Sequence, residues 1–68
     1  MMAFILNNYR IAKVKKFPKD KIKISKRLDP HHALVVFEGL TALEEGLARR
    51  YFGTPKDPSL VENLILEG

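Results

Sequence analysis

Cysteine and tryptophan are both absent from the sequence. Without cysteine the chain can form neither a disulfide nor a thiolate metal site, which is compatible with a reducing compartment. Its 68 residues are enough for one domain, which we place over residues 1–68. A chain of this length buries only a modest share of its surface. Its stability must therefore come from close packing, self-association or a bound partner.

Long apolar runs are missing as well. No run approaches the roughly 20 residues that a membrane-spanning helix needs. Residues 1–6 are too few for the apolar part of a secretion signal, and no base precedes them. We therefore expect a cytoplasmic protein that does not bind membranes. Because 46% of the residues are hydrophobic and 29% are charged, the composition is typical of a folded chain.

Acidic residues are scarce in the first part of the chain. Residues 1–28 carry nine bases and one acid, a net charge of +8, whereas residues 29–68 carry three bases and seven acids, a net charge of −4. A surface that served solubility alone would intersperse the two signs. The segregation predicts a basic face with an electrostatic role.

Two apolar segments indicate strands. Residues 3–6 form the first and are followed by Asn7 and Asn8, which suit a tight turn. Residues 33–37 form the second, and their β-branched side chains are typical of a buried strand that ends at Gly39.

Two basic segments between them also read as strands. Residues 9–16 alternate between apolar and basic side chains, and residues 21–28 alternate more clearly. Residues 17–20 connect them and contain Pro18, which presets the backbone for a turn. The pattern therefore predicts a basic antiparallel hairpin over residues 9–28.

A capping box predicts the main helix. Thr41 and Glu44 have the spacing at which the threonine hydroxyl accepts from the glutamate amide and the carboxylate reaches back. The helix should cover about residues 41–52 and end at Gly53. Its helical spacing predicts a core face made of Leu40, Leu43, Leu47 and Tyr51.

The same capping pattern begins again at Ser59 and predicts a short C-terminal helix through Leu66, although the last residues also suit an edge strand. We expect Leu60, Leu64 and Val61 to pack inward. The predicted fold is α+β: a small antiparallel sheet of three to four strands, one face covered by the main helix. The basic hairpin forms the exposed face, and residues 33–66 supply the strand-helix-helix part.

The register of the hairpin decides which bases face outward, because a one-residue slip reverses the faces of a strand. Lys21, Lys23 and Arg27 face outward in either register. A four-residue loop adds Arg10 and Lys16, whereas a three- or five-residue loop adds Lys13, Lys15 and Tyr9 and leaves a cleaner apolar inner face. The candidate nucleic-acid-binding residues are Lys21, Lys23, Arg27, Lys13, Lys15, Arg10, Lys16 and Tyr9.

These bases predict an anionic partner. Like charges across a hairpin repel one another, and a phosphate backbone would relieve that repulsion. Tyr9 among them could stack on an exposed base, or it could be a strand tyrosine that packs at the edge of the sheet. We predict a non-enzymatic module that binds DNA or RNA mainly through phosphates, with a homodimer doubling its basic surface. The alternatives are a small interaction module or regulatory subunit that docks an acidic protein, and lysines that only protect an edge strand.

Residues 21–30 resemble the opening of ribbon-helix-helix repressors, in which a short alternating strand leads through an Asp-Pro helix start into two helices. The resemblance implies a dimer whose paired strands enter the DNA major groove. It implies groove-facing roles for Lys21, Lys23 and Ser25. Lys26 departs from the family's alternation and Thr41 starts a fresh helix, so we do not adopt this fold. Residues 47–53 resemble the first helix and turn of a helix-turn-helix, but the loop that follows is too long.

Other chemistry finds little support in the sequence. His31 and His32 are adjacent and would point to opposite sides of a strand. Asp29 is the only other residue near them in the sequence that could bind a metal ion. No nucleophile stands with a base, and no glycine-rich loop could hold a phosphate. We therefore expect no metal, no cofactor and no enzymatic activity.

Overall fold

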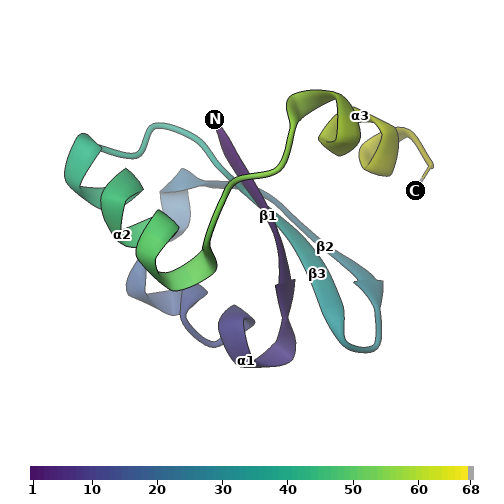
Figure 1. Cartoon of the computed structure of the whole chain (residues 1–68), viewed down its shortest axis with the longest axis horizontal. Helices are drawn as coiled ribbons and strands as arrows, with labels where there is room; N and C mark the ends of the chain where they lie inside the picture. Colours follow the sequence, from purple (N-terminus) through teal and green to yellow (C-terminus); the bar gives the residue numbers. More distant parts are fainter. Residues whose placement is uncertain (68) are drawn as a thin grey trace.

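Three strands form one antiparallel sheet in the order β1-β3-β2. The computed structural model describes residues 1–67, apart from the side chains of residues 58 and 65–67. β1 (Met2–Asn7) and β2 (Ile22–Asp29) both pair with the central strand β3 (His32–Phe37). The helices α2 and α3 flank this sheet (Figure 1). The predicted α+β fold, with a main helix and a short C-terminal helix, is confirmed.

The central strand is apolar along its length because both of its faces are covered. Val35 and Phe37 belong to one buried cluster, which α2 (Ala42–Phe52) covers, whereas Leu34 and Val36 belong to a second cluster under α3 (Pro58–Glu67). The prediction that only one face is covered was wrong. The sequence signal of double coverage was the unbroken apolar run in β3.

The predicted strand over residues 9–16 is wrong. This segment folds as the short helix α1 (Asn8–Ile11) and the 3-10 helix η1 (Val14–Lys16). The side chain of Asn7 caps α1 by accepting a hydrogen bond from the Arg10 amide at 2.9 Å, so the expected tight turn is a helix start.

The spacing of the apolar residues explains this correction. Ile11, Val14 and Phe17 recur every three residues, and all three pack on the cluster under α2. A three-residue repeat is the period of a 3-10 helix, whose side chains at i and i+3 are eclipsed. A second 3-10 turn, η2 (Lys19–Lys21), then leads into β2.

β2 forms its hairpin with β3 rather than with the preceding segment, so the predicted hairpin over residues 9–28 is wrong. Asp29 pairs with His32, which leaves Pro30 and His31 as a two-residue turn. Within residues 1–67 no residue other than glycine has positive φ, which excludes a primed turn. A register shift between Arg27 and Asp29 accommodates the strands.

A second register shift changes the faces of β2. It lies between Ile22 and Ile24, so Ile22 packs on the cluster under α2 while Ile24 and Leu28 pack on the cluster under α3. The odd-numbered residues of β2, among them Lys23, are exposed as predicted, whereas its apolar residues divide between the two faces of the sheet instead of sharing one.

α2 begins and ends as predicted. Thr41 and Glu44 form both hydrogen bonds of the capping box, and Gly53 with φ 83° ends the helix. Its inward face differs, because Leu43 is 76% exposed and Leu47 is 39% exposed.

The helix instead turns Ala48 and Phe52 into the core. The Phe52 ring stacks on that of Phe37 with centroids 6.0 Å apart, and the small side chain of Ala48 lets the helix lie close to the sheet. Leu40 and Tyr51 pack at the margin of this cluster.

α3 is held by Val61, whose side chain is 1% exposed, and by Leu64, which packs beside it. Leu60 is 41% exposed, so its predicted inward position is wrong. The helix is capped by Asp57 rather than Ser59, because the Asp57 carboxylate accepts from the Ser59 amide at 2.9 Å. The hydrogen bond from the Ser59 hydroxyl is the main cause that lowers the pKa of Asp57, and the bond from the Ser59 amide is the second.

Neither DNA-binding fold that the sequence resembles is present in the described residues. β2 pairs within its own chain, and a strand rather than a helix follows the Asp29-Pro30 step. α2 and α3 cover opposite faces of the sheet rather than forming a helix-turn-helix. None of the helices within residues 1–67 has the length and apolar character needed to cross a bilayer.

Candidate nucleic-acid interface

Two of the three bases expected to face outward are held in ion pairs. The Lys21 ammonium lies 2.8 Å from Glu44 Oε1, and its side chain is only 26% exposed, so its predicted outward position is wrong. This bond, followed by the Thr41 amide, lowers the pKa of Glu44. Lys23 lies 3.1 Å from a carboxylate oxygen of Glu38, with both side chains about half exposed.

Two other bases close the ends of helices. Arg10 donates from Nη1 to the carbonyl of Phe52 at 3.1 Å, where α2 ends. Lys26 donates from Nζ to the carbonyl of Leu64 at 3.0 Å in α3. Positive side chains at these ends complement both the unpaired carbonyls and the helix dipole. Arg10, which was predicted to contact phosphates, therefore makes a hydrogen bond within the fold instead.

The lysines around η1 are different. Among the side chains that the structure describes, they take part in no ion pair, and none of their ammonium groups donates a hydrogen bond. Phe17 holds the segment that carries these lysines against the core. Its side chain is 5% exposed, and the centroid of its ring lies 5.2 Å from that of Phe37 and 5.6 Å from that of Phe52. The set comprises Lys13, Lys15, Lys16 and Lys19.

The last turn of α2 adds two more bases to this surface. Lys16 Nζ lies 5.9 Å from the centroid of the Tyr51 ring, which brings η1 beside the end of α2. Arg49 and Arg50 are exposed there and make no ion pair within the described part of the chain. We call the six residues the basic patch: Lys13, Lys15, Lys16, Lys19, Arg49 and Arg50.

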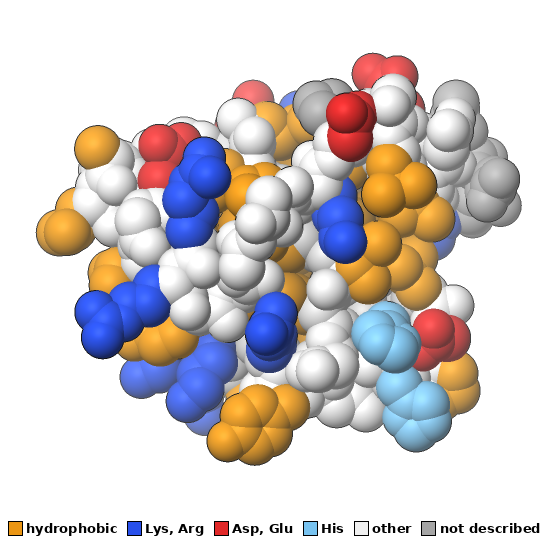
Figure 2. Space-filling view, viewed as in Figure 1, with side chains coloured by type: hydrophobic (Ala, Val, Ile, Leu, Met, Phe, Trp, Pro, Cys, Tyr) orange, Lys and Arg blue, Asp and Glu red, His pale blue; other side chains and the backbone are white. Residues whose placement is uncertain are grey.

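Figure 2 shows Lys and Arg side chains gathered at the lower left, over α2 and the segment after α1. Asp20 is the only acid among residues 13–20. Arg49 and Arg50 were not among the residues predicted for the site, because only the fold brings the end of α2 beside η1.

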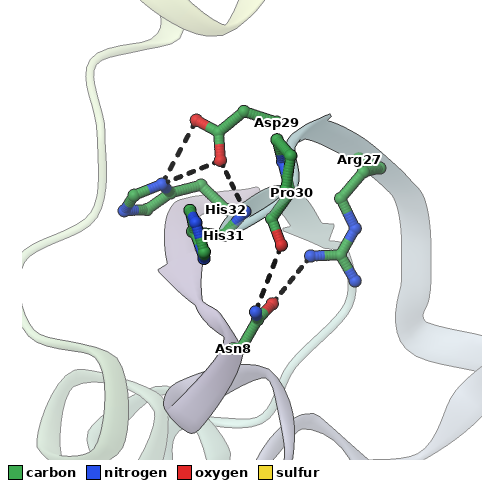
Figure 3. Close-up of polar contacts among 6 residues, drawn as sticks. All are labelled: Asn8, Arg27, Asp29, Pro30, His31 and His32. Carbon is green, nitrogen blue, oxygen red and sulfur yellow. Dashed lines mark hydrogen bonds and ion pairs between the residues drawn. The ribbon is translucent and has the colours of Figure 1, made fainter.

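Tyr9 lies on α1, four positions before Lys13 in the chain, and its side chain is 82% exposed. The residue before it, Asn8, joins α1 to the β2–β3 turn, as Figure 3 shows. Asn8 Nδ2 donates to the Pro30 carbonyl at 3.2 Å, and Asn8 Oδ1 accepts from Arg27 Nη1 at 2.8 Å. Arg27, the third base expected to face outward, is exposed as predicted.

The histidines lie at the same turn, where Asp29 organises them. Asp29 Oδ1 accepts from the His31 amide at 2.7 Å, and His32 Nδ1 lies 3.1 Å from the same oxygen. The His31 amide is the main cause that lowers the pKa of Asp29. Among the residues that the structure describes, no group of three or more metal-ligating side chains comes together.

Comparisons with protein-family models, with curated proteins and with solved structures give no match. The surface itself, with the charges that the fold pairs and those that it leaves unpaired, is therefore the feature that bears on function.

Proposed function

We propose that the protein is a non-enzymatic module that binds nucleic acid through the basic patch. One observation carries this proposal: Lys21 and Lys23 are held in ion pairs, whereas none of the six bases of the patch forms an ion pair within the described part of the chain. Uncompensated like charges on one surface repel one another, and a polyanion would remove that cost.

Phosphates are the part of a nucleic acid that this patch fits best. Four of its six members are lysines, whose ammonium groups act as point charges on flexible stems. Arginine, asparagine and glutamine are the usual readers of base edges, and only Arg49 and Arg50 belong to that group. We therefore expect salt-dependent binding with little preference for base sequence.

The test compares two double variants with equal charge. Lys15→Gln with Lys19→Gln removes two charges from the patch, and Lys23→Gln with Lys56→Gln removes two exposed charges outside it. Binding of a labelled oligonucleotide is followed by fluorescence anisotropy at several salt concentrations. Each lost phosphate contact removes about 0.7–0.9 from the slope of log affinity against log salt, so the patch variant should lose about 1.4–1.8.

The control variant should keep nearly the full slope. Equal losses in both variants would assign the binding to net charge and not to the patch. Absence of binding at low salt, or binding that ignores salt, would refute the proposed function.

A second candidate function is the docking of an acidic protein. The exposed Leu43 and Leu47 favour it, because they lie one helical turn apart on the helix that carries Arg49 and Arg50. A pull-down after nuclease treatment separates the candidates: capture of one defined protein supports docking, whereas loss of capture supports nucleic acid. The cytoplasmic location and the homodimer expected from the sequence stay predictions.

A further inference from the structure

We propose that Tyr9 is a stacking platform for an unpaired base, which makes single-stranded nucleic acid the ligand of the basic patch. This inference rests on the proposed function and names the class of its ligand. It is carried by three features of Tyr9: its exposure, the fixed backbone that presents it, and the bases that belong to or bond with its neighbours in the chain.

The ring of Tyr9 takes no part in either core cluster. At 82% exposure it is the most exposed of the large hydrophobic side chains in the described chain. Tyr51, by contrast, is partly buried against the cluster under α2, where its ring meets that of Phe17 edge-on. The Tyr9 ring therefore offers its faces to a ligand.

The backbone beneath this ring is held on both sides. Asn7 accepts from the Arg10 amide, and the Asn8 amide donates to the His31 carbonyl at 3.1 Å. The Asn8 side chain adds its two bonds to Pro30 and Arg27 (Figure 3). A ring mounted on a fixed backbone loses little conformational freedom when a base stacks on it.

Positive side chains belong to or bond with the residues next to Tyr9 in the chain. Asn8 accepts from Arg27, and the next residue along α1, Arg10, contacts the end of α2. That end carries two members of the basic patch, and residues 13–19 follow α1 directly. A strand whose phosphates lie on the patch can therefore place a base at Tyr9. Aromatic rings combined with a basic surface are the usual means of holding single strands.

A duplex does not fit this surface equally well. Its bases are stacked on one another and offer Tyr9 no free face, and α1 with four residues is too short to lie along a major groove. The inference therefore separates two ligands that share the same phosphates.

The experiment uses tyrosine fluorescence, because the chain has two tyrosines and no tryptophan. In the variant Tyr51→Phe, Tyr9 is the sole fluorophore. This protein is titrated with an oligothymidylate, an oligouridylate and a duplex of equal length, with correction for absorbance. We expect the single strands to quench the emission and the duplex to leave it nearly unchanged.

Two variants at position 9 complete the test. Tyr9→Ala should weaken single-strand binding about 5- to 150-fold, whereas Tyr9→Phe, which keeps the ring, should bind within about twofold of the parent. Salt-dependent binding that is unaffected by Tyr9→Ala, or equal quenching by duplex and single strand, would overturn the inference and leave the proposed function intact. No binding of any oligonucleotide at low salt would refute both.

Discussion

Residues 13–19 and residues 21–27 each carry four bases, and the fold treats the two halves of this stretch differently. In the second half, Lys21 and Lys23 pair with acids and Lys26 closes a helix. In the first half, no base is paired with an acid within the described chain. The two halves carry equal charge in the sequence. The fold uses the bases of the second half in its own contacts and leaves those of the first half available to a ligand, because different elements lie next to each half.

The largest expected effect on stability comes from truncating Phe17, which holds residues 13–19 against the core. Phe17→Ala empties a site that is 5% exposed and contacts two other phenylalanines, so it should destabilise the fold by about 3–5 kcal/mol. That is comparable to the whole stability of a domain of this size, at about 0.1 kcal/mol per residue. Urea unfolding followed by circular dichroism measures it. Tyr9→Ala, which truncates an exposed aromatic, is the control, and equal losses in both would contradict this assignment of the core.

The next largest effect on stability is expected at the start of α2, where Glu44 lies beside Lys21. Thr41→Ala removes the hydroxyl that accepts from the Glu44 amide at 3.2 Å and should cost about 1 kcal/mol. Thr41→Ser keeps the hydroxyl and should unfold at nearly the wild-type urea concentration. An unchanged midpoint in Thr41→Ala would mean that the cap contributes nothing.

Acid should then loosen the second half. The pKa of Glu44 is lowered chiefly by Lys21, so the folded state binds this proton less tightly than the unfolded chain. The stabilisation is complete above about pH 5 and is lost as the pH falls through the lowered pKa. Asp29 and Asp57 have lowered pKa values and act in the same direction. The urea midpoint should fall as the pH drops from about 5 to about 3.

Lys21→Gln tests the source of that acid sensitivity. Without the ammonium group, the pKa of Glu44 should move back toward its ordinary value, and the acid-dependent loss should shrink. Parallel curves for the variant and the wild type would show that Lys21 does not set the response.

The smallest expected effect is at Lys23. Its partner Glu38 and Lys23 itself are both about half exposed, so Lys23→Gln should change the free energy of unfolding by less than about 0.5 kcal/mol. A loss above about 1 kcal/mol in the same urea assay would show that this surface pair is structural.

Local signals in the sequence predicted much of the fold. The capping box at Thr41, the stop at Gly53 and the apolar run of β3 each act over a few residues, and each is present. Residues 9–16 could not be predicted in the same way, because alternation and a three-residue repeat both fit them. Packing of Phe17 against α2 and β3, which is tertiary, selects the helical turns.

The candidate site was predictable in its residue types but not in its grouping. Arg27 is exposed as expected and Tyr9 is exposed on a helix rather than on the predicted strand, whereas Lys21 is paired with an acid 23 positions away that no local pattern reveals. Arg49 and Arg50 join the basic patch only through the fold. Whether these residues bind nucleic acid stays a prediction.

The edges of the sheet bear on how concentrated solutions of the protein behave. The Lys56 amide donates to the Ala3 carbonyl at 2.7 Å, so the outer edge of β1 is already occupied at that point by its own chain. β2 forms the other edge, where two register shifts and the charges of Lys23 and Arg27 oppose pairing with a further strand. High salt screens those charges. At high salt we therefore expect sheets of different molecules to associate mainly through the edge of β2.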